Sequence, residues 1–526
     1  MRLAHFALPL ILLTPLALAA KTLTVCTEAS PEGFDVAQFN SLVTTNAAAD
    51  TVFDRLIDYD PVAKKLVPAL ATSWEVSPDG LSYTFTLRPN VAFQTTPYFK
   101  PTRNFNAKDV VFTFERMLRP DHPWFKTAVN GYPHAQSMQL NKLFKAINAI
   151  GNDKVRFELN YPESTFLATL SMGFASIYSA EYADQLDKDG QRGNLNTQPV
   201  GTGPFILRSF QKDSVVRYQP NPQYWGGKPK IDALVYAITP DPAVRVQKVK
   251  AGECQIALSP KPMDAIAQKG GPLTVEETPA FMTTFVALNS SHKPLDNPLV
   301  RQAINMAFDR SNYLKVVFNN TATAATGVYP PYTWSYNKAL KPYPYDPEQA
   351  RKLLAQAGLP NGFETTLWVR SSGASSNPNP RAGAELLQAD LAKIGIKAEV
   401  RTLEWGELIK RGKAGEHDML FMGWSGDNGD PDNFLTPQFS CAAVKGGTNF
   451  ARYCDPKLDG LIAEGKKTSS VAARTRIYQD AQKIIHDQAL WLPLVYPNSY
   501  ALVAKNVSGY KVNPFGRVNF SRVQVN

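Results

Sequence analysis

Apolar and polar residues alternate at every second position in several stretches of the chain, which is the pattern of a half-buried β-strand. In the clearest stretch, residues 68–93, the alternation continues on both sides of the turn signal Pro78-Asp79-Gly80. It predicts a β-hairpin with one buried face. The apolar residues of that face are Trp74, Val76, Tyr83, Phe85 and Leu87. The same alternation predicts strands at 22–26, twice within 201–225, at 231–238 and at 255–258.

Helix signals separate these strands. The sequence Asn106-Ala107-Lys108-Asp109 opens an amphipathic helix, and a second helix is predicted from Pro242 to about Ala251. A third begins at Asp346-Pro347-Glu348 and stops at Gly358, because Asp caps a helix start and Gly permits a left-handed end. A fourth spans 384–394, ends at Gly395 and precedes a strand at 396–404. This mixed order predicts α/β layers.

The length of the chain predicts more than one lobe. It has 526 residues, which exceeds what a single hydrophobic core usually organises. Two strand-like segments, near 278–290 and near 493–503, are candidates for crossings between two lobes. A chain that passes out to a second lobe and returns makes a two-stranded hinge, which suits closure around a ligand.

The first twenty residues predict a secretory signal peptide. Arg2 is followed by an apolar stretch with two prolines and then by small residues. Cleavage after Ala19 or after Ala20 fits equally well. No later stretch approaches the roughly 20 apolar residues that a membrane helix needs. We therefore expect residues 1–20 to be removed and the mature chain to lie in the periplasm.

The charge of the chain changes this picture little. The formal net charge is +10, but the basic residues are dispersed and no basic run of five occurs. A nucleic-acid partner is therefore not expected, and a weak preference for acidic ligands stays open.

The cysteines predict disulfides and not a metal site. Four cysteines in an exported chain suggest two disulfides, for which three pairings exist. Cys441 and Cys454 enclose only twelve residues with a flexible centre, which favours a local pair and leaves Cys26 to pair with Cys254. There is no C-x-x-C motif, and the six histidines show no ligand spacing. We expect neither a metal nor a cofactor.

Several motifs, taken together, resemble the peptide-binding family (family 5) of ABC-transporter solute-binding proteins. They occur in the family's order and cover essentially the whole mature chain. They are ALATSWEVSPDGLSYTFTLRPNVAF (69–93), FNAKDVVFTFERM (105–117), PVGTGPFIL (199–207), YWGGKPKID (224–232), LVRQAINMAFDR (299–310), YDPEQARKLLAQAG (345–358) and GWSGDNGDPDNF (423–434). The cysteines and the last motif are most similar to the dipeptide-binding branch, whose members have the disulfide pairs given above.

The resemblance implies an α/β, two-lobed periplasmic binding protein fold with mixed sheets, a two-stranded hinge and an extra subdomain in the first lobe. Lobe I would comprise 21–281 and 498–526, with the subdomain inserted at about 60–195, and lobe II would comprise 282–497. A short peptide would lie extended between the lobes, bound partly through its main chain. The partners would be two permease subunits and two ATPases, and we expect the chain to be a monomer.

The resemblance also assigns a residue to the peptide's ammonium group. A desolvated ammonium needs a fixed anion, and the family supplies a carboxylate just after a Gly-Trp pair. Asp427 matches that position. From the sequence alone, Asp427 could equally be a solvated turn residue, or a calcium ligand with Asp430 and Asp432. The loop lacks the Glu that ends an EF-hand site.

Other contacts follow from the same comparison. Trp424, Ser425 and Gly426 would pair with the peptide main chain or line a side-chain pocket, although Trp424 could simply be a core residue. In the loop after the first strand, Phe39, Asn40 and Ser41 match a first-lobe contact region.

One position departs from the family pattern. Dipeptide binders carry an arginine shortly before Asn-Pro-Asn that clamps the peptide carboxylate. Counting back from Asn377, the matching residue here is Ala374. Either Arg370 or Arg381 supplies the charge, or the ligand is longer. Arg370 is the tentative choice. The departure leaves tripeptides, glutathione-like peptides or a broader peptide set open.

An enzyme is the main rival class, and the sequence does not favour it. The segment from Gly423 to Asp427 breaks the G-x-S-x-G pattern, and no histidine has a recognisable nucleophile partner. We therefore predict a binding protein for di- and tripeptides. The alternative is a relative of the same fold that binds glutathione, haem or antimicrobial peptides.

Overall fold

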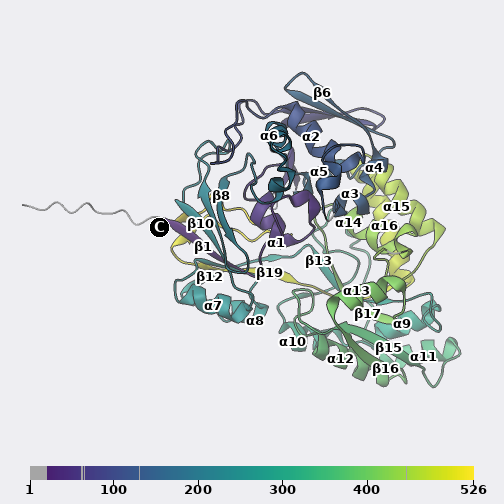
Figure 1. Cartoon of the computed structure of the whole chain (residues 1–526). Helices are drawn as coiled ribbons and strands as arrows, with labels where there is room; N and C mark the ends of the chain where they lie inside the picture. Colours follow the sequence, from purple (N-terminus) through teal and green to yellow (C-terminus); the bar gives the residue numbers. More distant parts are fainter. Residues whose placement is uncertain (1–20, 61–62, 64, 130, 446) are drawn as a thin grey trace, which may run out of the picture.

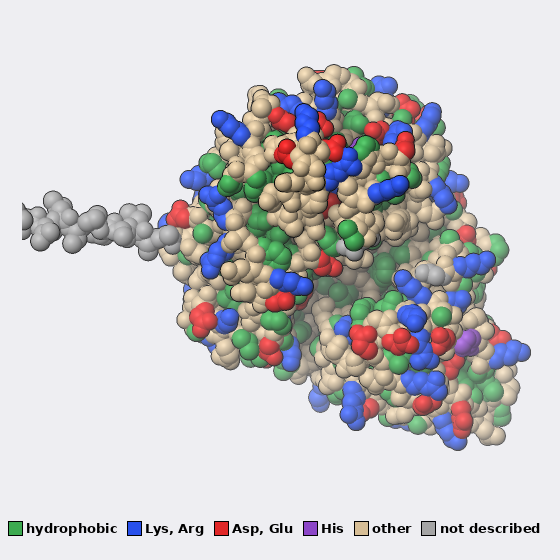
Figure 2. All heavy atoms as spheres, viewed as in Figure 1, with side chains coloured by type: hydrophobic (Ala, Val, Ile, Leu, Met, Phe, Trp, Pro, Cys, Tyr) green, Lys and Arg blue, Asp and Glu red, His purple; other side chains and the backbone are tan. Residues whose placement is uncertain are grey.

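The computed structural model describes residues 21–60, 63, 65–129, 131–445 and 447–526. The predicted signal peptide lies outside the described residues. Two large mixed sheets, each covered by helices, form two lobes, drawn as the upper and lower masses in Figure 1. Figure 2 shows a hollow between these masses. The predicted α/β fold with mixed sheets is confirmed.

The first lobe is built on a seven-stranded sheet. Its central strand is β1, which runs parallel to its neighbours β10 and β11. The strands predicted at 22–26, within 201–225, at 231–238 and at 255–258 are all present in it. The order is β12 (Leu273–Pro279), β19 (Asn498–Ala504), β11 (Ile256–Leu258), β1 (Thr22–Thr27), β10 (Ala233–Ile238), β9 (Val215–Pro220), β8 (Phe205–Gln211).

Residues 71–159 contain a four-stranded antiparallel sheet that is separate from the seven-stranded sheet. It has the order β4 (Ala71–Val76), β5 (Ser82–Leu87), β7 (Lys154–Leu159), β6 (Phe144–Ile150). The predicted hairpin is β4 and β5, but its single buried face is wrong for β4. Tyr83, Phe85 and Leu87 are buried, whereas Val76 is 43% exposed. The reason is that β4 is an edge strand, so only β5 has a neighbour on both sides.

The second lobe is built on a six-stranded sheet. Its order is β14 (Thr323–Ala324), β18 (Trp491–Tyr496), β13 (Met282–Leu288), β17 (Met419–Ser425), β15 (Glu364–Arg370), β16 (Lys397–Leu403). The helices of this lobe are α9 (Pro298–Ala307), α10 (Arg310–Phe318), α11 (Pro347–Gln356), α12 (Pro380–Ala392), α13 (Trp405–Ala414), α14 (Asp432–Phe439), α15 (Pro456–Lys467) and α16 (Val471–Asp487).

Most helix starts follow from their caps. Asn106 and Asp109 form a capping box at α2 (Ala107–Leu118), and Asp346 caps α11. The start predicted for α12 is wrong by four residues, because Asn379 accepts the Ala382 N–H and begins the helix at Pro380. No described helix is both long and apolar enough to cross a membrane.

The remaining elements are short and lie mostly in the first half of the chain. Those that bear on the site are α1 (Leu42–Thr44), α7 (Pro242–Lys250) and α8 (Pro262–Ile266). The others are β2 (Ile57–Asp60), β3 (Lys65–Pro68), α3 (Pro133–Ser137), α4 (Leu140–Leu143), α5 (Phe166–Leu170), α6 (Ala180–Lys188), β20 (Val507–Ser508) and β21 (Gln524–Val525).

The chain crosses between the two large sheets at two adjacent points. One lies between β12 and β13, and the other, at Pro497, lies between β18 and β19. The Ala280 N–H donates to the Pro497 carbonyl at 3.0 Å, so the crossings are side by side. Both fall within the segments that the sequence pattern singled out. Two adjacent crossings that run in opposite directions permit hinge motion of one sheet relative to the other.

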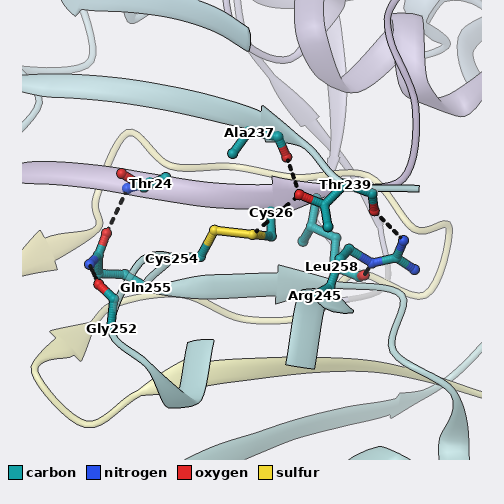
Figure 3. Close-up of a disulfide and its surroundings, with 9 residues drawn as sticks. All are labelled: Thr24, Cys26, Ala237, Thr239, Arg245, Gly252, Cys254, Gln255 and Leu258. Atoms are coloured by element: carbon teal, nitrogen blue, oxygen red, sulfur yellow. Dashed lines mark hydrogen bonds between the residues drawn. A yellow bond between two sulfur atoms is a disulfide. The ribbon is translucent and has the colours of Figure 1, made fainter. Parts of the chain in front are cut away.

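Both predicted disulfides are confirmed. Cys441 pairs with Cys454 within one loop. Cys26 pairs with Cys254, which joins the end of β1 to the segment just before β11 (Figure 3). The second bond therefore links two neighbouring strands of the first sheet that are far apart in sequence.

Candidate functional site

A cleft of about 520 Å³ lies between the two lobes. The first lobe contributes Glu28, Leu42, Val43, Asn46, Arg245 and the segment from Leu258 to Pro262. The second lobe contributes Gly373, Ala374, Ser375, Pro378 and Ser425, while the crossings and the C-terminal segment contribute residues such as Ala280, Tyr500, Tyr510 and Arg517. A cleft with two walls joined by crossing strands can close on an extended ligand.

Asp427 follows the cleft-lining end of β17. Its side chain is exposed, and its backbone N–H donates to the Asn433 Oδ1 at 3.0 Å. Surrounding protein nevertheless removes part of its hydration, which raises the pKa of the Asp427 carboxyl to about 6. Asp427 is not itself among the cleft-lining residues; Ser425, two positions earlier, is the residue at the end of β17 that lines the cleft. Among the described residues, no cation pairs with this carboxylate.

The two neighbouring acids of the loop are used inside the protein. Asp430 forms a buried bidentate ion pair with Arg474, with both N···O distances at 2.9 Å. Asp432 is buried and accepts a hydrogen bond from the Thr436 hydroxyl at 2.7 Å; burial raises its pKa to about 7. In the described part of the chain, no group of three or more His, Cys, Asp or Glu side chains is arranged to hold a metal. The calcium alternative thus gains no support.

The residues before Asp427 have structural as well as lining roles. The half-buried Trp424 donates its Nε1–H to the Asn433 carbonyl at 2.7 Å and packs against a core cluster. Ser425 is exposed and lines the cleft. Gly426 donates its N–H to the Phe281 carbonyl at 2.8 Å, and a Cβ there would lie 2.3 Å from the Phe281 ring. This close approach requires glycine at position 426.

The predicted first-lobe contacts lie beside the cleft lining. Phe39 is half-buried and Asn40 is exposed. Ser41 caps α1 by accepting the Thr44 N–H at 3.2 Å. The lining itself begins at the next residue, Leu42, and continues with Val43 and Asn46. The sequence carries no separate signal for these three, because α1 and the π-helical turn Thr45–Ala49 that follows it are too short to show an amphipathic period.

Ala374, the residue that matches the clamping arginine of dipeptide binders, lies in the second-lobe wall of the cleft. Its backbone and that of Asn377 exchange two hydrogen bonds, at 2.9 and 3.0 Å. Arg370 stacks its guanidinium 4.7 Å over the Trp405 ring and donates to the Ser372 hydroxyl. Arg381 is 87% exposed and pairs with Glu385. Neither arginine belongs to the described cleft lining.

The charged residues that line the cleft come from the first lobe and the C-terminal segment. They are Glu28, Arg245, Lys261 and Arg517. Arg517 is already neutralised by ion pairs with Asp50 and Asp58, at 2.6 and 3.1 Å. The sequence analysis missed Arg245 and Lys261. A possible signal was the helix start Asp-Pro-x-Val-Arg, which recurs later as Asn-Pro-x-Val-Arg.

Comparison with known proteins adds to this geometry. Residues 65–446 match the family model described as bacterial extracellular solute-binding proteins, family 5 middle. The chain is 62% identical to "Probable di/tripeptide-binding protein 5" of Pseudomonas aeruginosa, with all of both chains covered. It is 42% identical to "Heme-binding protein A" of Haemophilus influenzae, covering 96% of this chain and 92% of the relative.

A solved structure agrees with these matches. The dipeptide-binding protein from Pseudoalteromonas sp. SM9913 in complex with Met-Leu is 34% identical and superposes with a TM-score of 0.84, covering 96% of this chain and all of that one. The family is defined by solute binding, in agreement with the choice of a binding protein over an enzyme. This chain belongs to family 5 of the bacterial extracellular solute-binding proteins.

Proposed function

We propose that this protein captures di- and tripeptides between its lobes and delivers them to an ABC importer. The observation that carries the proposal is Asp427, an accessible carboxylate that has no cation partner among the described residues. Its raised pKa reports a site where an ionised carboxylate is poorly solvated. A peptide's terminal ammonium would supply the missing counter-charge.

Ligand names of the relatives support the same class. A full-length relative at 62% identity is named for di- and tripeptides, and the Met-Leu complex shows a dipeptide on the same fold. In this proposal Ser425 and Gly426 offer polar backbone to the peptide, and Trp424 walls a side-chain pocket. Phe39, Asn40 and Ser41 support the opposite wall.

The carboxylate end of the ligand is where this chain differs from dipeptide binders. Ala374 stands at the position of the clamping arginine, and Arg370 is engaged with Trp405 and Ser372. Arg370 therefore stays a tentative contact that would have to leave its stacked position. A neutral wall at Ala374 is compatible with ligands of more than one length, since no charge fixes where the peptide must end.

Export and closure complete the proposal. The signal peptide 1–20 directs the chain to the periplasm, lobe I comprises 21–281 and 498–526 with an inserted subdomain at about 60–195, and lobe II comprises 282–497. The paired crossings at Ala280 and Pro497 act as the hinge. The partners are the permease subunits of the importer and their ATPases. Mass spectrometry of the exported protein distinguishes cleavage after Ala19 from cleavage after Ala20.

The test is a ligand screen on the purified mature protein. Free amino acids, di-, tri- and tetrapeptides, N-acetylated dipeptides and glutathione are compared by thermal shift, because a ligand that binds only the folded state raises the melting temperature. We expect stabilisation by di- and tripeptides and none by N-acetylated ones. The proposal fails if no peptide stabilises the protein.

Haem is the second ligand class to include, because a relative at 42% identity is named for it. A hemin titration followed by absorbance measures it directly. Hemin binding that peptides do not displace would favour this alternative.

A further inference from the structure

Arg245 is a buried cation in the wall of the cleft. It lies on α7, is 2% exposed and belongs to the cleft lining. Its guanidinium donates only to backbone carbonyls. Nε donates to Leu258 at 2.9 Å, Nη1 to Thr239 at 2.8 Å and to Pro240 at 2.9 Å, and Nη2 to Ser259 at 2.8 Å. Figure 3 shows it beside Leu258 and Thr239, next to the disulfide.

These carbonyls belong to the ends of two strands that flank β1. Thr239 and Pro240 follow β10, whereas Leu258 ends β11 and Ser259 follows it. The segment from Leu258 to Pro262 lines the cleft. Ser259 has a φ of 47°, a left-handed conformation that a residue with a side chain adopts only when its surroundings hold it. The arginine therefore fixes the course of a cleft-lining segment.

Burial lowers the pKa of the Arg245 guanidinium, and no ion pair offsets that burial among the described residues. The acids whose charge acts on it are Glu28, which also lines the cleft, and Asp241, whose carboxylate accepts two N–H groups at the start of α7. The four carbonyl contacts must then hold the charge in place. A buried charge that is bound in this way tolerates little change of geometry.

The second lobe contains a similar arginine, which is also buried at the start of a helix and donates to backbone carbonyls. Asn297-Pro298-Leu299-Val300-Arg301 opens α9 as Asp241-Pro242-Ala243-Val244-Arg245 opens α7. Arg301 is 1% exposed. Its Nη1 donates to Leu295 and Asp296, which lie six and five residues earlier, as Thr239 and Pro240 do for Arg245; its Nε donates to Gln488. In the described chain Arg301 is not part of the cleft lining.

We propose that Arg245 is a positioning residue for ligand binding, which sets the first-lobe wall by holding the carbonyls of Leu258 and Ser259, with Ser259 in its left-handed conformation, at the start of the segment that runs to Pro262. The proposal rests on the function proposed above. Arg301 binds backbone carbonyls in the same way, but it is not among the residues that line the cleft. Comparing the two arginines therefore separates two effects of these carbonyl contacts: stabilisation of the fold, expected for both residues, and support of the cleft wall, expected for Arg245 alone.

The experiment compares Arg245→Lys with Arg301→Lys. Lysine keeps the charge but cannot reach four carbonyls with a rigid fork. Melting temperatures are measured without ligand, and the Kd for the best peptide of the screen is measured by calorimetry. We expect similar losses of melting temperature, an affinity loss of about tenfold for Arg245→Lys, and an unchanged Kd for Arg301→Lys.

The outcomes distinguish failure of the positioning role of Arg245 from failure of the proposed peptide-binding function. An unchanged Kd in Arg245→Lys, or equal losses of affinity in both variants, overturns the positioning role. Failure of the wild-type protein to bind any peptide overturns the proposed function instead. The pair Arg245→Met and Arg301→Met repeats the comparison without the charge, and if one of these does not fold, the lysine pair decides.

Discussion

The two walls of the cleft differ in both charge and support. The first-lobe wall carries Glu28, Arg245 and Lys261, whereas the second-lobe wall is neutral and consists of Met282, Gly373, Ala374, Ser375, Pro378 and Ser425. Charged groups restrict how a zwitterionic ligand can lie. Small neutral residues leave room for different side chains and lengths. The comparison teaches that one wall of a cleft can fix the orientation of the ligand while the opposite wall accepts ligands with different side chains and lengths.

The two walls also differ in how firmly the surrounding structure holds them, and the charged wall is held more firmly. The first wall is braced by the Cys26–Cys254 bond and by the four hydrogen bonds of Arg245. The second wall is a loop held by the Ala374–Asn377 backbone pair and by the Thr284 hydroxyl, which donates to Ser376 at 2.6 Å. Within the described residues, the buried side-chain amide of Asn377 has no hydrogen-bond partner. We therefore expect the second wall to be the more adaptable one.

The largest effect is expected at Asp427, which follows two residues after Ser425 of the neutral wall. Asp427→Asn removes the counter-charge of the ammonium group, and we expect peptide affinity to fall by about 100-fold. Calorimetry with one dipeptide measures this. Asp480→Asn, at an exposed position of α16, makes the same change of net charge and should leave the Kd unchanged. Equal affinities in both variants would remove Asp427 from the site.

The same variant has a stability signature. In the folded protein the Asp427 pKa of about 6 lies above the usual value of about 3.9 in an unfolded chain. Ionisation between these values thus favours the unfolded state, and the penalty is fully present at pH 7. Asp427→Asn should therefore not lower the melting temperature of the ligand-free protein at pH 7. A clear decrease would mean that the carboxylate has a structural partner.

The next effect is a pH dependence of binding. Only the ionised carboxylate attracts the ammonium group, so affinity should fall as pH decreases through about 6. Between pH 7 and pH 5 we expect a loss of about tenfold for a peptide with uncharged side chains. Calorimetry in matched buffers tests it. Asp427→Asn should give a flat profile, and an equally steep profile in that variant would assign the titration to another group.

A smaller effect is expected from placing a charge in the neutral wall. Ala374→Arg introduces a guanidinium where dipeptide binders carry one, and we expect the affinity ratio of dipeptide to tripeptide to rise about fivefold. Ala374→Gln, which is polar and neutral but shorter than arginine, is the control. A ratio that rises equally in both variants would show that side-chain volume, and not charge, sets the length of the ligand.

The smallest effect concerns Lys261 on the charged wall. Its ammonium is exposed, and we expect Lys261→Gln to weaken binding of a free peptide carboxylate about threefold relative to the C-terminal amide. The exposed Lys269, which pairs with Glu277 at 3.1 Å, provides the control Lys269→Gln. An unchanged acid-to-amide ratio in Lys261→Gln would place the ligand's carboxylate away from the first wall.

The sequence predicts local elements better than the contents of the cleft. The hairpin at Pro78 and the capped helices could be read because their signals lie within a few adjacent residues. The exposure of Val76 could not, since it depends on β4 being an edge strand. Arg245 was missed for a related reason. The residues next to an arginine on a surface helix do not indicate whether its side chain points to solvent or donates to backbone carbonyls elsewhere in the chain.

The position of β1 in the middle of its sheet has a consequence for biosynthesis. Its two neighbours begin only at Ala233 and Ile256, and β19, which closes the sheet beside β11, ends at Ala504. The first strand to emerge from the ribosome therefore has no partner until the chain has been made as far as β10, and the sheet is incomplete until β19 has been made near the C-terminus. Contacts of such high sequence separation form slowly. The strand order therefore delays completion of this sheet until late in synthesis, which is compatible with the export proposed above.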